Sequence, residues 1–446
     1  MRSIVERFKC PNWCRAAFRA TYVLSAVGGL ILIAGARLSL AGFRADENYW
    51  EWLGRITASM LCHLGGGFTK VGQIVSTRYD VWPAPFLKQM QAIQDRVPPF
   101  DSATARSVVV HAFNRPLESV FQYFDDAPIA SGTVAQIHYA VDQDGRELAV
   151  KVRRPRIDDL FRIDTYLLRK MAAIAAALPF LRSVPVIETA SEIGDLLQNQ
   201  TDLLVEARWH RLFFSSLRQM PELIVPQTVD ELCTNEVLTM EFLSGLHRLD
   251  DMSLPAAARR RAILTTLRAV YLLMFKMGLV HCDLHPGNIY LIPSGSPVLL
   301  DFGFCGQMKE RERKLFSELF LCIAMSDGDG AARIVVEMAL APPSPVWDEE
   351  SFCKEIGEIV SDAFGKRASN FLVGEFVLKL FSVQRRWNLR ASAGFSQPLL
   401  SLLVFEGIVR GLYPDLDFQR EALPFVLAEG SRPGATPLAS LGCDCS

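Results

Sequence analysis

The stretch that decides the fold is the segment HCDLHPGN at residues 281–288, followed by LLDFG at residues 299–303. Asp283 and Asn288 lie five residues apart in a polar loop, and Asp301 ends an apolar run 18 residues after Asp283. In phosphoryl transfer an Asp positions or deprotonates the attacking hydroxyl, while an Asn and a second Asp hold Mg²⁺ against the phosphates. The two segments therefore predict a catalytic Asp283 and the metal ligands Asn288 and Asp301. The alternative is a helix-to-strand loop in which His and Asn are turn residues.

A lysine in the middle of an apolar strand is the second signal. Lys151 lies in Glu147–Val152, a predicted strand, and burying an unpaired ammonium group is costly. Phosphate oxygens and a helix glutamate would supply partners, and Glu206 is the candidate. Asp202 and Glu206 are four residues apart and are predicted to share a helix face. Taken singly, Lys151 could be an exposed edge-strand lysine and Glu206 part of a solvated face. In the order Lys, Glu, Asp, Asp, they favour a kinase-like site.

A short run of small residues lies between the first two predicted strands, where a kinase has its glycine-rich loop. It comprises Ala130, Ser131, Gly132 and Thr133, with a single glycine. Small residues let the backbone approach phosphates closely, so these four are candidates for nucleotide binding. The alternative is a plain turn.

Lys70 and Gln73 lie one helical turn apart in a predicted helix that follows three glycines at 65–67. The glycines do not have the spacing of a phosphate-binding P-loop, and no strand precedes them. From periodicity alone, Lys70 and Gln73 are a surface pair.

Composition excludes several classes of protein. The chain has 446 residues, a net charge of −2 and 50% apolar residues, which is ordinary for a globular protein. Without a basic excess, nucleic acid is not expected as a partner. The ten cysteines lie mostly in apolar runs, which predicts reduced, buried thiols rather than a disulfide framework. No C-x-x-C pair occurs, so no structural zinc site is expected.

The pattern of apolar residues divides the chain into five parts. Residues 1–44 form a basic and apolar anchor or targeting segment, and 45–115 a helical extension. Residues 116–243 form a β-rich lobe with inserted helices, 244–428 a larger helical lobe, and 429–446 a loose tail. Within these parts we expect a short strand at 223–226, one long helix at 255–280 and a loop-rich stretch at 281–307.

The N-terminal segment has the composition of a membrane contact. Residues 20–36 are 17 uncharged residues, the lower limit for a membrane span, and residues 1–19 are basic. A single span, an interfacial or re-entrant anchor, a targeting segment and a buried helix all remain open. The positive-inside rule would send the rest of a spanning chain away from cytoplasmic ATP, so we favour a peripheral or hairpin-like anchor. No later stretch is expected to be long and apolar enough to span a membrane.

Several motifs in chain order resemble the UbiB/ADCK (AarF-like) family of atypical kinases. The resemblance covers residues 55–425 and includes the small-residue loop, the strand with Lys151 and the two segments quoted first. The motifs specific to the family are Lys70-x-Gly72-Gln73, Ser76-Thr-Arg78, Leu87 to Gln94-Asp95, Val97-Pro-Pro99 and Glu406-Gly-x-x-Arg410-x-Leu-x-Pro414.

The resemblance implies an α+β, two-lobed protein-kinase-like fold whose helical N-terminal extension packs over the active site. It implies that Lys151 holds the α- and β-phosphates and pairs with Glu206, and that Asp283 is catalytic. Lys70 and Gln73 would form an inhibitory, specificity-setting pair that enters the site and excludes ordinary protein substrates.

The implied cofactors are ATP or ADP and Mg²⁺, with a role in ubiquinone or related isoprenoid-lipid biosynthesis. The implied partners are a membrane surface, a quinone-type lipid and quinone-biosynthesis proteins. The implied location is a bacterial inner membrane, on its cytoplasmic face, or a mitochondrion.

Two positions depart from the family pattern. Gly132 stands where the loop usually has Ala, and Gln200 stands where Glu usually precedes Asp202. At both positions the chain resembles the divergent second ADCK branch. Two other functions stay open: a nucleotide-switched pseudokinase scaffold or lipid chaperone, and a small-molecule phosphotransferase. The motif Lys70-x-Gly72-Gln73 disfavours the phosphotransferase.

Overall fold

The computed structural model describes residues 12–40, 46–76, 78, 82–90, 93, 97–176, 186–340, 347–363 and 373–427. The chain divides into two compact units. Unit 1 comprises residues 1–215, 224–246 and 298–304, and unit 2 comprises 216–223, 247–297 and 305–446. The predicted tail at 429–446 lies outside the described residues. The predicted boundaries at 45, 116 and 244 stay predictions.

The first part of unit 1 is helical: α1 (Asn12–Leu40), α2 (Glu47–Leu64), α3 (Gly67–Ser76) and α4 (Ala84–Met90). The Asp46 side chain accepts from the Tyr49 amide and so caps the start of α2. Gly65 and Gly66 both have positive φ, at 62° and 59°, which ends α2 and lets α3 begin within two residues. The three glycines therefore set where the helix with Lys70 begins.

An apolar core joins these helices to α6 (Ile157–Ala175) and α7 (Val186–Gln200). Leu61, Phe68, Leu87 and Phe161 are almost fully buried in it. Gly72 permits close packing, because a Cβ at this position would lie 2.3 Å from the Ile93 side chain. The glycine of the Lys70-x-Gly72-Gln73 motif thus serves helix packing.

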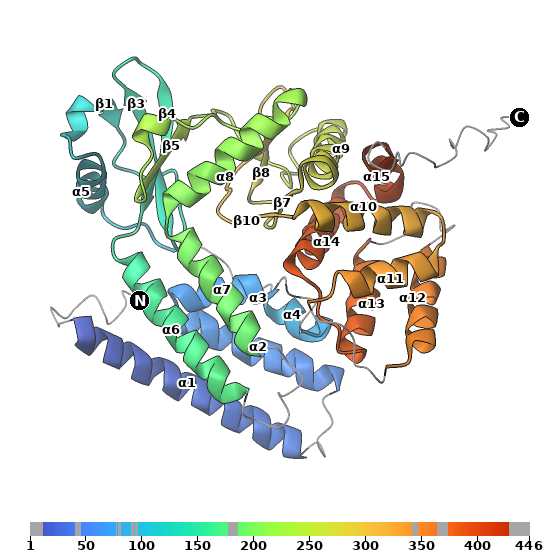
Figure 1. Cartoon of the computed structure of the whole chain (residues 1–446). Helices are drawn as coiled ribbons and strands as arrows, with labels where there is room; N and C mark the ends of the chain where they lie inside the picture. Colours follow the sequence, from blue (N-terminus) through green and yellow to red (C-terminus); the bar gives the residue numbers. More distant parts are fainter. Residues whose placement is uncertain are drawn as a thin grey trace, which may run out of the picture. The chain divides into compact units, whose positions relative to one another are not determined.

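A five-stranded sheet forms the second part of unit 1. Its strands are β1 (Phe121–Phe124), β2 (Ala130–Ser131), β3 (Ala135–Asp142), β4 (Glu147–Arg153) and β5 (Val237–Glu241). They pair antiparallel in the order β1-β3-β4-β5, with β2 on β3 (Figure 1). Helix α5 (Ser102–Phe113) packs against the sheet, and α8 (Leu203–Ser216) precedes β5. Since β4 lies between β3 and β5, Lys151 is on an interior strand and the edge-strand alternative is wrong.

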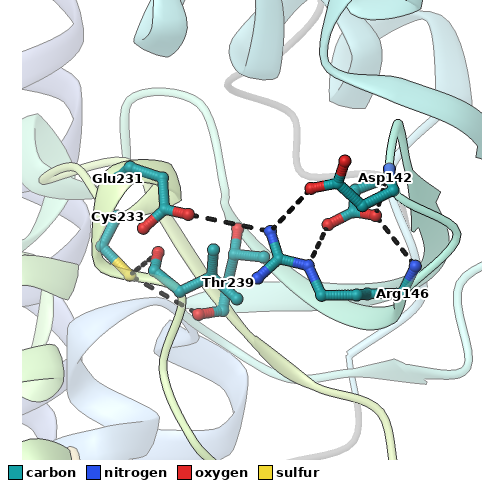
Figure 2. A network of polar contacts seen from close by, with 7 residues as sticks. Asp142, Arg146, Glu231, Cys233 and Thr239 are labelled. Carbon is teal, nitrogen blue, oxygen red and sulfur yellow. Dashed lines mark hydrogen bonds and ion pairs between the residues drawn. The ribbon is translucent and has the colours of Figure 1, made fainter.

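The turn between β3 and β4 is fixed by the Asp142 carboxylate. It accepts from the backbone amides of Asp144 and Arg146 and from Arg146 Nε, while Gly145 adopts a φ of 80°. Figure 2 shows the Arg146 side chain between Asp142 and Glu231, with the Cys233 thiol directed at the Thr239 carbonyl oxygen nearby. This network fixes the register of the hairpin that carries Lys151.

Unit 2 is mainly helical. It contains α9 (Ala256–Tyr271), α10 (Glu310–Ala324), α11 (Gly328–Glu337), α12 (Glu349–Ala363), α13 (Val373–Arg386), α14 (Ala393–Leu412) and α15 (Phe418–Leu427). Strand β7 (Leu279–His281) pairs with β10 (Cys305–Gln307), and β6 (His247–Arg248) pairs with β8 (Ile289–Leu291). Strand β9 (Pro297–Leu299) begins at the last residue of this part of unit 2 and continues into unit 1, where it leads toward Asp301. Short 3₁₀ turns span Leu217–Gln219 in unit 2, and Leu117–Ser119 and Asp230–Leu232 in unit 1.

The long helix expected at 255–280 is present from Ala256 to Met277, and its last turn, Leu272–Met277, is π-helical. It ends there because Gly278 has a φ of 67° and a strand follows. The loop-rich stretch expected at 281–307 contains three short strands. Two other details of the sequence prediction are wrong. The strand expected at 223–226 is only an isolated bridge at Ile224, since Pro226 has no amide to donate. Among the described cysteines Cys282 is buried, but Cys62 is exposed and the others are intermediate.

Two described helices are long and apolar enough to cross a membrane, Ala17–Leu40 and Gly394–Leu412. The expectation that no later stretch would pass this test is therefore wrong. More than half of the second helix, 56%, is buried among its neighbours, as is typical of a core helix. The first is only 6% buried and is the stronger candidate for a membrane contact.

Helix α1 lies along α2 and α6 (Figure 1). A buried ion pair holds it against these helices. Both Arg19 Nε and Nη2 donate to the Asp164 carboxylate on α6 at 2.8 Å, and Asp164 is fully buried. Arg19 also donates to the carbonyl oxygens of Leu64 and Gly65, where α2 ends. The Gly67 amide, at the start of α3, donates to Asp164. One guanidinium thus joins α1, α2 and α6, and its partner carboxylate also holds α3.

We expect Arg19→Met to lower the free energy of unfolding by about 3–5 kcal/mol, because Asp164 would be left buried without its cation. Combining it with Asp164→Asn should recover a large part of that loss. Urea unfolding at pH 7.5, followed by circular dichroism, measures both. Arg55→Met is the matched control, since Arg55 pairs with Glu51 on the surface and its loss should cost less than about 1 kcal/mol. A loss of less than about 1 kcal/mol for Arg19→Met would contradict the structural role of the Arg19–Asp164 pair.

Candidate functional site

Three charged side chains of unit 1 meet beside β4, the strand that carries Lys151. Lys151 Nζ lies 2.6 Å from Glu206 Oε1, on α8, and 3.7 Å from Asp301 Oδ2. The side chains of Lys151 and Glu206 are only 12% and 7% exposed, whereas that of Asp301 is 49% exposed. The expected pairing of Lys151 with Glu206 is therefore present, and the carboxylate of Asp301 is the member of this group that solvent reaches.

Burial and neighbouring charges act in opposite directions on Glu206. Burial raises the pKa of its carboxyl group, and Lys151 is the main group that lowers it. Asp301 adds to the rise in the pKa, whereas the charge of Lys70 lowers it. Helix α3 thus brings Lys70 near enough to act on the buried carboxylate. Gln73 follows one turn later on α3 and is half-buried.

Asp301 has an unusual backbone conformation. Its φ is 58°, in the left-handed region that non-glycine residues rarely adopt, and its Oδ1 accepts from the Gly303 amide at 3.0 Å. A Cβ at position 303 would lie 3.1 Å from Asp301 Oδ1 and 3.4 Å from Glu206, so glycine keeps space beside both carboxylates. Phe302 is fully buried against His210 and Phe213 and anchors the turn.

His210 belongs to this arrangement and was not predicted from the sequence. It lies one helical turn after Glu206 on α8, and its Nε2 donates to the Pro226 carbonyl oxygen at 2.6 Å. Burial lowers its pKa to about 4, so its ring is neutral at pH 7. The spacing of four residues from Glu206 is the signal that could have identified it.

Asp202 does not lie on the helix face shared with Glu206, so that prediction is wrong. Helix α8 begins at Leu203, and the Asp202 carboxylate accepts from the Leu204 amide just before the first turn. Asp202 is a helix-capping residue here, because a carboxylate that precedes a helix satisfies its unpaired amides.

The four residues of the small-residue loop differ in exposure. Ala130 is exposed, Ser131 and Gly132 are half-buried, and Thr133 is buried. Ala130 and Ser131 form β2, and the Gly132 amide donates to the Ala135 carbonyl oxygen at 2.9 Å. Of the four, Thr133 presents the least surface to a ligand.

The other predicted residues lie in a braced loop of unit 2, after β7. Asn288 Nδ2 donates to the Asp283 carbonyl oxygen at 2.9 Å, and His285 Nε2 lies 3.6 Å from Asp283 Oδ2. Ser401 donates to the His281 carbonyl oxygen. Burial raises the pKa of the Cys282 thiol, which keeps it protonated and unsuited to metal binding.

The donor set fits a magnesium ion that is completed by a nucleotide. In the described part of the chain no three His, Cys, Asp or Glu side chains form a metal-binding group. Mg²⁺ prefers oxygen ligands and is usually held by one or two carboxylates together with substrate phosphates and water. The half-exposed carboxylate of Asp301 suits this kind of site.

Comparison with known proteins identifies the family. A model of the ABC1 atypical kinase-like domain matches residues 92–335, more than half of the chain. The chain belongs to this family. Among its relatives is a protein of Aeromonas hydrophila named "Probable protein kinase UbiB", 30% identical over 371 residues, which are 81% of this chain and 68% of that protein. A protein of the same name from Xylella fastidiosa is 31% identical over 381 residues, 83% of this chain and 68% of that protein.

A solved structure supports the fold. The complex of Rv3197 with erythromycin from Mycobacterium tuberculosis matches with a TM-score of 0.51 at 21% identity, over 79% of this chain and 93% of that chain. The predicted α+β, protein-kinase-like fold with a helical N-terminal extension is confirmed, and so is the resemblance to the UbiB family. The roles of the individual site residues stay predictions.

We expect His210 to make stability depend on pH. Because its pKa in the folded state is about 4, below its ordinary value of 6.5, its protonation opposes folding. Its stabilising contribution is complete above about pH 6.5 and is lost as the pH falls toward 4, by up to about 3 kcal/mol. Urea unfolding at several pH values should show a shallower decline for His210→Gln than for the wild-type chain. His63→Gln, at an exposed position, is the control; equal slopes for His210→Gln and wild type would contradict the assignment.

Proposed function

We propose that this chain binds ATP or ADP with Mg²⁺ and acts as an atypical kinase or ATPase in ubiquinone or related isoprenoid-lipid biosynthesis at a membrane. The observation that carries the catalytic part is the buried Lys151–Glu206 pair beside the half-exposed Asp301. The quinone part rests on the relatives named UbiB.

The geometry of the pair supports phosphate binding. A lysine held in the middle of a sheet by one buried glutamate keeps its ammonium group fixed in place, at the cost of removing both charges from water. Asp301 adds negative charge 3.7 Å away on the solvent side, where a cation would be attracted. In our proposal Lys151 binds the α- and β-phosphates, and Asp301 and Asn288 hold Mg²⁺, which offsets phosphate charge.

The other predicted residues take complementary roles in this proposal. Asp283 positions or deprotonates the phosphoryl acceptor or water, and residues 130–133 line the phosphates. In this proposal Lys70 and Gln73 restrict access to the site, and the charge of Lys70 helps to lower the pKa of Glu206. A quinone-type lipid and quinone-biosynthesis proteins are the proposed partners.

Nucleotide binding can be tested by thermal unfolding. At MgATP concentrations near one hundred times the dissociation constant, binding should add about 2.7 kcal/mol, or about 5 °C in melting temperature. Lys151→Met should abolish the shift, and Asp301→Asn should abolish its dependence on Mg²⁺. Lys379→Met, at a surface ion pair of unit 2, is the control that should keep the full shift.

The outcomes separate the candidate functions. No shift with ATP or ADP in the wild-type chain would refute the nucleotide site. A shift that depends on Mg²⁺ without any release of phosphate would favour the pseudokinase scaffold over the ATPase. Stimulation of phosphate release by added prenyl-phenol lipids would support the lipid-linked role.

For the membrane contact, we propose that α1 lies in the plane of the bilayer surface. Its exposed side carries large apolar residues: Phe18, Leu24, Ile31, Leu32 and Ile33. Its other side is attached near both ends, through Arg19 to Asp164 and through Arg37, which lies 4.3 Å from the Trp52 ring centroid. If α1 crossed a bilayer while it is attached in this way, α2 would enter the lipid with its exposed charged residues, such as Arg55. Burying those charges in lipid is costly, so α1 does not cross the bilayer in this arrangement. The basic residues at 2–15 would meet anionic headgroups.

We expect Leu32→Ser combined with Ile33→Ser to weaken binding to vesicles of phosphatidylcholine and phosphatidylglycerol by at least about tenfold, because two apolar side chains leave the lipid. Vesicle flotation measures the binding. The control pair is Met252→Ser with Leu340→Ser, two exposed apolar residues of unit 2. A tag fused before residue 1 should stay cleavable by protease added outside the vesicles. Unchanged binding, or a protected tag, would contradict the in-plane arrangement.

A further inference from the structure

We propose that Arg154 is a positioning residue that clamps the small-residue loop, residues 130–133, and ties it to residues 98–100 of the helical extension. The inference deepens the proposed function and rests on it, because it concerns how the nucleotide loop of that same site is held. Arg154 follows β4 directly, three residues after Lys151. It was not singled out from the sequence.

The clamp on the loop consists of two side-chain hydrogen bonds. Arg154 Nε donates to the Gly132 carbonyl oxygen at 2.8 Å, and Nη2 donates to Ser131 Oγ at 2.8 Å. The Arg154 amide also donates to the Val134 carbonyl oxygen at 2.8 Å, which extends the pairing of β3 with β4. A planar guanidinium with donors in a fixed fork is suited to hold two acceptors at once, and lysine cannot reproduce this geometry.

The same guanidinium reaches residues 98–100 of the helical extension. Nη2 also donates to the Pro98 carbonyl oxygen at 2.8 Å, and the guanidinium lies 5.3 Å from the Phe100 ring centroid. Gln136, on β3, adds a second attachment, because its Oε1 accepts from the Phe100 amide at 3.0 Å. Residues 98–100 of the extension and the small-residue loop therefore share one anchor.

The clamp has a consequence for the single glycine of the loop. Glycine allows more backbone conformations than alanine, so Gly132 by itself would make the loop less defined. Arg154 holds the carbonyl group of that very residue. The loop can then have a small residue where phosphates approach and still keep a fixed backbone. Preorganisation of this kind raises affinity, because less conformational entropy is lost when the ligand binds.

The first test needs no nucleotide. In Arg154→Met, amide hydrogen exchange over residues 130–135 should become about tenfold faster, since the loop loses bonds from a charged donor. Arg154→Lys should behave like Arg154→Met, because a single ammonium cannot bridge the two acceptors. Arg169→Met is the control: it removes a surface arginine of α6 that pairs with Asp195 on α7, outside the hairpin, and should leave exchange at 130–135 unchanged.

The second test separates positioning from a merely structural role. In both Arg154 variants the KM for ATP should rise about tenfold, while kcat at saturating ATP stays within about twofold, because Lys151, Asp301 and Asp283 are untouched. A structural defect would instead lower kcat through a smaller folded fraction and leave KM unchanged.

Three results would overturn the clamp: unchanged exchange in Arg154→Met, faster exchange with an unchanged KM, or wild-type behaviour of Arg154→Lys. A wild-type chain that binds no nucleotide would instead refute the proposed function. In that case faster exchange over 130–135 in Arg154→Met would still support the clamp itself.

Discussion

The buried ammonium group of Lys151 is the constraint on which the rest of unit 1 depends. An ammonium placed in the middle of a sheet requires a carboxylate, and an element that packs beside β4 must bring it there. Helix α8 supplies Glu206, and the turn after β9 supplies Asp301. The helix boundary at Leu203, the left-handed backbone of Asp301 and the glycine at 303 all help to set the positions of these carboxylates.

A second buried pair, Arg19 with Asp164, has a different consequence. Unlike the group around Lys151, this pair has no carboxylate that solvent reaches. It joins helix α1 to α6, to the end of α2 and to the start of α3. Because the Gly67 amide is bonded to Asp164, the start of the helix that carries Lys70 is tied to α1. The Asp164 carboxylate thus links α1, which has the exposed apolar face, to α3, which carries the motif Lys70-x-Gly72-Gln73. Buried ion pairs give little net stability, so the geometry that they impose is their main contribution.

The fold class and the pairing of Lys151 could be predicted because each depends on the order of residue types along the chain. A lysine inside an apolar strand, followed by a helix glutamate and two later aspartates, leaves few arrangements that satisfy the charges. Asp202 was placed wrongly because spacing alone cannot separate a residue inside a helix from one that caps it. The edge-strand alternative for Lys151 could be rejected only once strand order was known, since the order depends on pairing between distant segments.

Arg154 and Arg19 show why the remainder could not be predicted. The partners of Arg154 lie 22 to 56 residues away in the sequence, and those of Arg19 lie 45 to 145 residues away. Most of these partners are backbone carbonyl groups, and no sequence pattern surrounds them. A carbonyl oxygen is present at every residue, so nothing in the residue type marks Gly132 or Leu64 as an acceptor. Sequence patterns report which groups must be paired, such as Lys151, but the backbone path decides where a guanidinium finds its acceptors. The residues that hold a site in place are consequently harder to predict than the charged residues that form it.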